Sequence, residues 1–334
     1  MRNLSIMNGY FHTACYQEAG EGHISQGKPC EDAVRTGVRN GVAIAVLSDG
    51  AGSCEHAAEG AQIVTDTAFA LIAEQFDSLY DMTEQECAEV LLTAVREALA
   101  ETAERMGYDD KSLSATMLCT ALAEDGRYFY FHVGDGVIAG CTPEGECCVL
   151  SHYVHDIAPN FTTFVTLPDA EYQWGKGRNS YRAFFLMSDG PEEFLLMDDG
   201  RLTSRGDSAL YLSFFFDEEM LEQELQMLTE LLKEWNMYDD ASYALLADKR
   251  SAGSVSAWLP GSLSEILFGK KRISRRKLRH REQLFRRLSE CGHLTLRQTG
   301  VILHTYRKKR TQNALEPFIN SGILHLKDEI CYFD

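Results

Sequence analysis

The sequence predicts an α+β protein in which antiparallel sheets are covered by helices, with a small basic helical module at the C-terminal end. Three observations support this prediction. Short apolar segments end repeatedly at Asp-Gly or Asp-Asp, as buried strands do when they finish at a turn. Hairpin-like strand pairs dominate the middle of the chain, which favours antiparallel pairing. The acidic and basic side chains are concentrated in different parts of the chain.

The charge distribution predicts two folded units. Residues 1–248 hold 43 acidic and 14 basic side chains, whereas residues 249–334 hold 7 and 18. Because such a break marks a boundary, we expect a domain over 1–248, a linker over 249–269 and a basic module over 270–334. No membrane span or signal core is evident, and the ten cysteines lack metal-type spacing. We therefore expect a cytoplasmic protein with reduced thiols.

The first third of the chain combines two strands with two long helices. In order, we expect a strand within 4–19, a glycine-containing loop over 23–29, a strand over 42–48, and helices over 55–76 and 83–107. The strand over 42–48 is almost wholly apolar and bounded by glycine. The second helix begins at Thr83, because Glu86 has the spacing of a capping box.

Strands dominate the middle of the chain. We expect strands over 114–122, 127–133, 137–141, 146–150 and 184–187, a loop-rich stretch over 160–180, a helix over 217–235 and a last strand over 241–247. Asp125-Gly126 predicts a hairpin turn. The helix over 217–235 carries leucines and methionines at helical spacing.

The basic module is expected to contain helices over 270–290, 295–310 and 311–321, followed by a hairpin over 323–333. Helices followed by a hairpin suit a winged-helix-like arrangement. Its apolar residues at helical spacing favour a folded unit over a disordered arm: Leu278, Leu284, Phe285, Leu288, Leu296, Val301, Ile302, Leu303, Leu315, Phe318 and Ile319.

Carboxylates recur at the ends of the expected strands. These residues are Asp32, Asp49, Asp135, Asp189 and Asp239. A single Asp-Gly pair is commonly just a turn, but several that follow apolar strands indicate a shared site. Converging carboxylates without neighbouring bases need cations, and hard oxygen ligands favour magnesium or manganese.

Six short motifs occur in order: CEDA at 30–33, SDGAGS at 48–53, SATML at 114–118, VGDG at 133–136, MSDG at 187–190 and DDAS at 239–242. Over residues 5–248 the chain resembles the metal-dependent protein phosphatases of type 2C, and its DGAGS motif resembles their bacterial branch. The resemblance implies a four-layer α-β-β-α sandwich. It also implies hydrolysis of phosphoserine and phosphothreonine by hydroxide held between two ions.

The resemblance assigns roles to individual residues. Asp49 looks like the carboxylate that bridges two Mn²⁺ or Mg²⁺ ions, and the Gly50 carbonyl resembles a ligand of one of them. Asp189 and Asp239 resemble ligands of the other ion. Asp32 would bind through water, and Asp135 resembles a ligand of a weaker third ion in some members.

Three positions depart from the family pattern. Gly27 stands where an arginine often holds substrate phosphate, so Lys28 is expected to supply a looser contact. Ala51 replaces a histidine of the eukaryotic members, and Asp240 replaces the usual asparagine. His23 and His56 lie near the motifs; ordinary structural roles are favoured, and donation to substrate is the alternative.

The sequence leaves more than one function open. The favoured one is an active serine/threonine phosphatase acting on a phosphoprotein that a kinase has modified. The alternatives are a phosphatase-like sensor without turnover and a nucleic-acid-binding regulator that uses the basic tail. The module is expected to pack on the acidic domain or hold a protein partner, rather than chiefly to bind nucleic acid.

Overall fold

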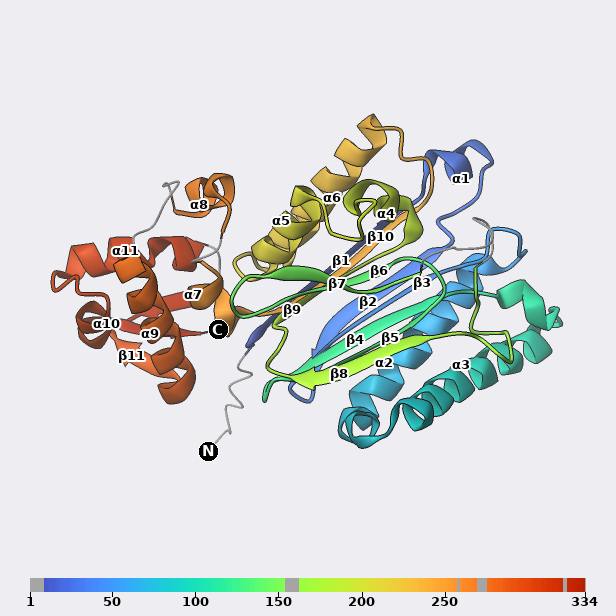
Figure 1. The fold of residues 1–334 in the computed structure, drawn as a ribbon, viewed down its shortest axis with the longest axis horizontal. Helices are drawn as coiled ribbons and strands as arrows, with labels where there is room; N and C mark the ends of the chain where they lie inside the picture. Colours follow the sequence, from blue (N-terminus) through green and yellow to red (C-terminus); the bar gives the residue numbers. More distant parts are fainter. Residues whose placement is uncertain (1–8, 154–161, 257–258, 269–274, 321–322, 334) are drawn as a thin grey trace.

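The computed structural model describes residues 9–153, 162–256, 259–268, 275–320 and 323–333 (Figure 1). The strands are β1 (Phe11–Glu18), β2 (Asp32–Arg39), β3 (Val42–Asp49), β4 (Met117–Ala123), β5 (Arg127–Val133), β6 (Val137–Cys141), β7 (Cys147–His152), β8 (Gln173–Arg178), β9 (Ala183–Met187), β10 (Ala241–Asp248), β11 (His293–Thr295), β12 (Leu324–Lys327) and β13 (Ile330–Phe333). The helices are α1 (Glu21–Ser25), α2 (Ala57–Asp81), α3 (Glu84–Met106), α4 (Asp189–Leu195), α5 (Ser204–Ser213), α6 (Glu218–Glu234), α7 (Ala252–Val255), α8 (Gly261–Phe268), α9 (Arg275–Cys291), α10 (Leu296–Ile302) and α11 (Lys308–Asn320), with 3-10 turns η1 (Asp110–Leu113) and η2 (Lys249–Ser251).

Two antiparallel five-stranded sheets form the centre of the fold. One has the order β1-β10-β9-β6-β7 and the other β2-β3-β4-β5-β8. The α+β class expected from the sequence is therefore confirmed. Within the described part of the chain, no helix is long and apolar enough to cross a membrane.

Side-chain alternation along β3 shows how the layers are built. Ala43, Ala45 and Leu47 point into the apolar core between the two sheets. The intervening residues, such as Ile44 and Val46, point to the other face and pack against α2, which in turn packs against α3. Because a strand directs successive side chains to opposite faces, a strand buried on both sides must be apolar throughout. This explains the uninterrupted apolar run in the sequence.

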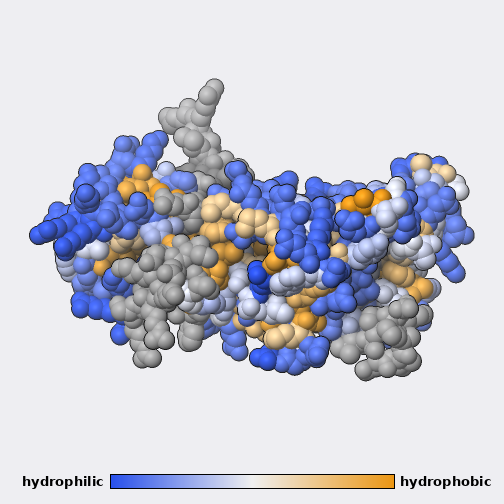
Figure 2. Space-filling model, turned by 90° about the horizontal axis from the view of Figure 1, so that it is seen from above, coloured by the Kyte–Doolittle hydropathy of each residue, from blue (hydrophilic) through white to orange (hydrophobic). Residues whose placement is uncertain are grey.

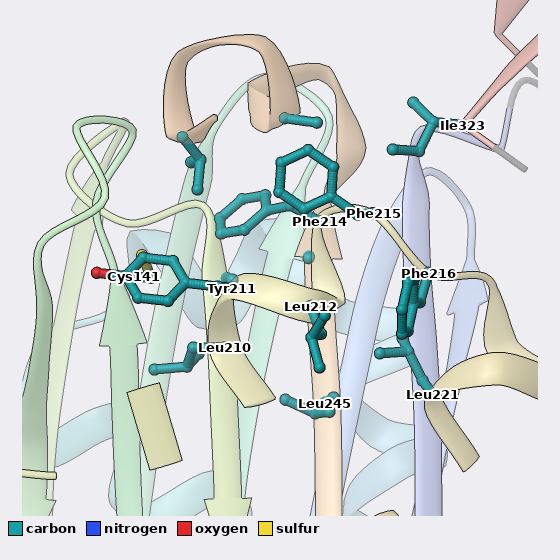
Figure 3. Close-up of a cluster of buried hydrophobic side chains, with 14 of the residues drawn as sticks. Cys141, Leu210, Tyr211, Leu212, Phe214, Phe215, Phe216, Leu221, Leu245 and Ile323 are labelled. Atoms are coloured by element: carbon teal, nitrogen blue, oxygen red, sulfur yellow. The ribbon is translucent and has the colours of Figure 1, made fainter. Parts of the chain in front are cut away.

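Helices cover the outer face of each sheet, so the layers are helix, sheet, sheet and helix (Figure 1). Thr83 caps α3 through the predicted capping box with Glu86, and Gly107 ends that helix in the left-handed conformation. On the other face, α5 packs on β9 and β10, and α6 packs on β1. Figure 3 shows the aromatic run Phe214 to Phe216 in this outer core, where all three rings are buried.

Several elements differ from the sequence-based expectations. The stretch expected to be a loop over 160–180 contains β8, and the loop over 23–29 begins within α1. The segment expected as a linker over 249–269 is largely helical, with Ala252 and Val255 fully buried. Helices α4 and α5 and strand β11 were not predicted.

The C-terminal module is folded, as its apolar residues predicted. Helices α9, α10 and α11 pack with a three-stranded antiparallel sheet of order β11-β13-β12. The hairpin turn is at Asp328 and Glu329, both with positive φ. The basic run 307–310 begins α11 instead of ending the preceding helix, as the sequence had suggested. Residues 270–274 and the side chain of Leu278 lie outside the described part.

The module packs against the sandwich through apolar contacts. The ring of Phe333 lies edge-on to Tyr10, with centroids 6.3 Å apart. The ring of Phe285 lies beside Gly253, where an added Cβ would come within 3.1 Å of it. Ile323 belongs to the same cluster of buried apolar side chains as Phe214 to Phe216 (Figure 3). The module therefore packs on the sandwich, as expected, and the contacts described here between the two are apolar, so hydrophobic burial contributes to the packing.

Candidate active site

Asp49 is fixed at the end of β3 by hydrogen bonds to the segments that adjoin β2 and β4. Its N–H donates to Thr116 Oγ1 at 2.9 Å, and the Thr116 N–H donates to the Asp49 carbonyl at 2.8 Å. The next N–H, of Gly50, donates to the Glu31 carbonyl at 3.1 Å. The carboxylate of Asp49 is therefore presented from a rigid backbone.

Asp32 lies opposite Asp49 in the β2–β3 register and is 4% exposed. Burial, with the nearby Asp240 charge, raises the pKa of Asp32 to about 7. Burial and the charges of Asp32, Asp189 and Asp135 likewise raise the pKa of Asp49 well above its usual range. These carboxylates are close enough to oppose one another's ionisation.

Asp189 is the first residue of α4, directly after β9. Burial, followed by the charges of Asp135, Asp239 and Asp32, raises its pKa strongly. The next residue, Gly190, lies against the backbone before β10, because an added Cβ would lie 2.2 Å from the Asp240 carbonyl oxygen. That close approach brings the ends of β9 and β10 together.

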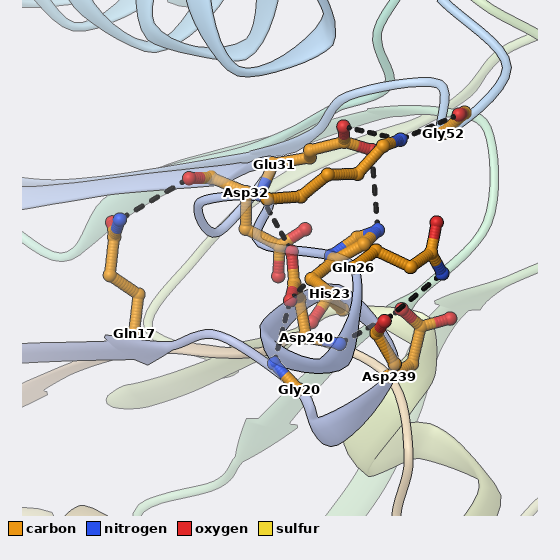
Figure 4. A network of polar contacts seen from close by, with 12 residues as sticks. Gln17, Gly20, His23, Gln26, Glu31, Asp32, Gly52, Asp239 and Asp240 are labelled. Atoms are coloured by element: carbon orange, nitrogen blue, oxygen red, sulfur yellow. Dashed lines mark hydrogen bonds and ion pairs between the residues drawn. The ribbon is translucent and has the colours of Figure 1, made fainter.

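Asp240 is buried and holds two separate segments with one carboxylate. Its Oδ1 accepts the Gly20 N–H at 2.7 Å, and its Oδ2 accepts the Glu31 N–H at 2.6 Å. His23 Nδ1 lies 2.8 Å from Asp240 Oδ1, and His23 Nε2 lies 3.3 Å from Glu31 Oε2 (Figure 4). Asp240 therefore joins α1, the start of β2 and the start of β10.

Three candidate metal ligands lie close together among the described residues. Atoms of His23, Asp239 and Asp240 lie within 4.8 Å of one another. Asp239 was predicted as a ligand, whereas His23 was predicted near substrate and Asp240 was only noted as a departure. This group adjoins the cluster of Asp32, Asp49 and Asp189 through the Asp32–Asp240 and Asp189–Asp239 interactions.

Asp135 sits between two glycines with positive φ, Gly134 and Gly136. An added Cβ on Gly134 would come within 2.5 Å of Thr116 Cγ2, so this loop packs against the residue that hydrogen-bonds to Asp49. The Thr162 hydroxyl donates to the Asp135 carboxylate. The Asp135 charge contributes to the raised pKa of both Asp49 and Asp189, which places it beside the same cluster.

Lys28 lies at the rim of the site. Its ammonium donates to Glu31 Oε1 at 3.0 Å and to the Gly52 carbonyl at 3.3 Å, and its side chain is 37% exposed. It lines an open cleft with Glu31, Gly52 and the first residues of α2. Gly27 has φ +70°, with open space where a Cβ would point.

The two histidines have different surroundings. His23 is held between two carboxylates, as described above, whereas the ring of His56 stacks on Tyr108 with centroids 3.5 Å apart. Sequence reasoning missed the paired role of His23 and Asp240, and also the support of Asp49 by Thr116. The only sequence signal for the first pair was the unusual second aspartate at 240.

The arrangement is a set of buried and half-buried carboxylates that oppose one another's ionisation, next to an open cleft with the Lys28 ammonium group. The Oδ2 atom of Asp32 is buried without a hydrogen-bond partner in the described part of the chain. Carboxylates that oppose one another's ionisation, and that no basic side chain among the described residues neutralises, are suited to binding hard divalent cations. The donor set therefore fits such ions.

The fold and the site together define a class: a two-sheet sandwich with an acidic centre where β2, β3, β9 and β10 meet. The sequence model of protein phosphatase 2C matches residues 19–235. The chain belongs to the protein phosphatase 2C family, as its motifs suggested. No individually curated protein matches the sequence.

Solved structures share the fold at low sequence identity. PppA, described as a key regulatory component of T6SS in Pseudomonas aeruginosa, is 16% identical with a TM-score of 0.50. The match covers 71% of this chain and 97% of PppA. A bacterial serine phosphatase bearing an arginine-to-lysine mutation is 15% identical, also with a TM-score of 0.50 over 71% of this chain and 97% of the other. These matches establish the sandwich fold.

Proposed function

We propose that this protein is a metal-dependent serine/threonine protein phosphatase. The observation that carries the proposal is the carboxylate set of buried Asp32 and half-buried Asp49 and Asp189, whose pKa values are raised by desolvation and by the charges of neighbouring carboxylates. Such a set is destabilising unless protons or cations neutralise it. Its position within the family match supports a phosphatase centre.

Asp49, Asp189, Asp239 and the Gly50 carbonyl would hold two Mn²⁺ or Mg²⁺ ions, with Asp32 orienting water nearby and Asp135 beside a third position. Bound ions would supply an activated water molecule and offset the negative charge on the phosphoryl oxygens. The protein's own contribution is rigidity: Asp49 is clamped between two strands, and Asp240 ties three segments to the site.

Substrate phosphate would enter through the cleft beside Lys28. Lys28 supplies a point charge that a phosphoryl group can share with Glu31 and Gly52, its present partners. A single ammonium orients phosphate less strictly than a bidentate guanidinium does. His23 faces Glu31 and Asp240, so its main role would be to hold the loop before β2 in place.

The substrate class follows from the family: a phosphoprotein modified on serine or threonine by a kinase. The ten cysteines are all free, which fits a reducing compartment such as the cytoplasm. A second candidate function, sensing a phosphoprotein without turnover, is favoured by one observation only, the absence of a guanidinium at Gly27.

The deciding experiment compares the full chain with Asp49→Asn in two assays. Hydrolysis of p-nitrophenyl phosphate and a phosphothreonine peptide is measured with and without Mn²⁺, and Mn²⁺ binding is followed by calorimetry. We expect activity to require Mn²⁺ and to fall at least 100-fold in the variant, with weaker ion binding.

The matched control is Asp198→Asn, which removes the same charge from an exposed loop between α4 and α5. It should retain wild-type activity. Ion binding without hydrolysis by the wild type would favour the sensor. Wild-type turnover in Asp49→Asn at saturating Mn²⁺ would contradict the assignment of Asp49.

A further inference from the structure

The C-terminal module has the element order of a helix-turn-helix unit with a hairpin beside it. Helix α9 is followed by the short strand β11, the helices α10 and α11 joined by a tight turn, and the β12–β13 hairpin. In DNA-binding proteins with two helices so joined, the second helix enters the major groove. Helix α11 occupies that second position here.

The turn between α10 and α11 is held rigidly. The Thr305 N–H donates to the Gly300 carbonyl at 2.9 Å, and the hydroxyls of Thr305 and Thr311 lie 2.8 Å apart. A Cβ on Gly300 would come within 2.9 Å of Thr311 Oγ1, so the two helices approach closely at this point. The first turn of α11 is therefore presented in a fixed direction.

The exposed surface of this turn is basic. Arg307, Lys308, Lys309 and Arg310 are consecutive and all exposed. The start of α9 adds to them, because His280 stacks on His304 with centroids 4.3 Å apart. Exposed Arg276 and Arg279 lie on that same part of α9. We call these residues, Arg276, Arg279, Arg307, Lys308, Lys309 and Arg310, the basic surface.

The positive charge of the basic surface also affects the pKa of His280. Partial burial of the His280 ring, followed by the positive charges of His304, Arg276 and Arg279, lowers the pKa of His280. Acidic groups are present at one edge. Lys308 forms an ion pair with Glu329 at the hairpin tip, beside Asp328, and Glu316 lies further along α11.

The basic surface lies away from the acidic sandwich. In Figure 1, α10 and α11 form the far end of the module, whereas Phe285 and Phe333 on its other side contact Gly253 and Tyr10. Figure 2 shows mostly hydrophilic residues over that end of the molecule. The positive charge is thus left for a partner outside the chain.

We propose that the basic surface binds duplex DNA, with the first turns of α11 in the major groove. Duplex DNA carries about one negative charge per 1.7 Å of its axis, which suits arginines and lysines spread over two neighbouring helices. Asn313, exposed one turn after Lys309, has the donor and acceptor groups that can pair with an adenine edge. The activity would thereby be brought to DNA-bound phosphoproteins.

The test measures binding of the full chain to a fluorescein-labelled random 25-bp duplex by anisotropy, at 50 to 200 mM KCl. The variant is Lys309→Ala/Arg310→Ala. Its matched control, Arg286→Ala/Arg287→Ala, removes two exposed charges about 9 Å further along α9 from His280. We expect micromolar binding that weakens with salt. We also expect the variant to bind at least tenfold more weakly and to lose about two units of salt slope, with the control within twofold of wild type.

Three results would overturn the proposal. The first is no binding to the duplex at 50 mM KCl, and the second is an equal loss of affinity in the control and the variant. The third is competition by poly-L-glutamate as strong, charge for charge, as that by unlabelled duplex, since an acidic protein surface would then be the better partner. Circular dichroism of both variants checks that the module stays folded.

Discussion

Asp32 and Asp49 stand directly opposite each other in the register of β2 and β3, one at the start and one at the end of its strand. Each side chain lies in the field of the other, and both pKa values are raised. The antiparallel pairing therefore fixes two carboxylates at a spacing that is unfavourable without a cation or a proton between them.

Metal binding is predicted to depend on pH through these groups. Since the pKa of Asp32 is raised to about 7, protons compete with ions below that pH, and Mn²⁺ affinity should rise from pH 6 to pH 8. Calorimetric titration at the two pH values measures this. In Asp32→Asn the pH dependence should shrink, and equal affinities at both pH values in the wild type would contradict the prediction.

Asp240→Asn is predicted to destabilise the fold although asparagine is usual here in the family. Both Asp240 oxygens accept backbone N–H groups, from Gly20 and Glu31. An amide can accept only one of them and directs its NH₂ at the other. We expect a loss of about 1–3 kcal/mol in the free energy of unfolding, measured by urea denaturation. Asp239→Asn, with its exposed carboxylate, should change stability much less in the metal-free protein.

Lys28→Ala is predicted to raise the Michaelis constant for a phosphopeptide more than it lowers the turnover number. The ammonium is positioned by Glu31 and Gly52 at the cleft and would attract phosphate before the chemical step. Lys28→Arg should keep or lower the Michaelis constant. An unchanged constant in Lys28→Ala would remove this residue from the substrate site.

His12 is predicted to weaken the fold in acid. Burial, with the nearby Lys249 charge, lowers its pKa to about 3, while its Nδ1 lies 3.0 Å from the Ser213 carbonyl. Because the unfolded chain takes up a proton near pH 6.5 and the folded chain does not, stability is full above that pH. It falls by about 1.4 kcal/mol per unit below it.

The matching measurement is urea unfolding at pH 7.5 and pH 5.0 for wild type and His12→Gln. The stability difference between the two pH values should be smaller by about 2 kcal/mol in the variant. His132, whose pKa burial lowers to about 4, contributes equally to both proteins and cancels. An identical difference in the two proteins would show that His12 is not kept neutral.

The elements whose local sequence pattern matches their role in the tertiary structure were predicted correctly. The apolar run of β3 and the capping box at Thr83 are local signals, and both elements formed as predicted. Strand β8 was missed because its sequence, QWGKGR, is polar and rich in glycine. The rings of Tyr130 and Tyr128 lie over Gly175 and Gly177, so pairing with β5 makes this segment a strand.

The acidic centre was only partly foreseeable. Carboxylates that follow apolar strands are visible in the sequence, and the structure brings Asp32, Asp49 and Asp189 within electrostatic reach of one another. The contact of His23 with Asp240 joins segments that are far apart in the sequence. The five-residue helix α1, which carries His23, has no apolar periodicity from which it could be predicted. No local rule could have paired these two residues.

The partner of β1 in its sheet is β10, with Phe11 opposite Asp248. At about 5–20 residues per second of translation, the second strand leaves the ribosome roughly 10–50 s after the first. Until β10 is made, β1 has no partner on the edge where β10 will pair, and β9, which is made shortly before β10, also lacks that neighbour. Asp239 and Asp240 directly precede β10, so the acidic centre is completed only when this late strand has been made.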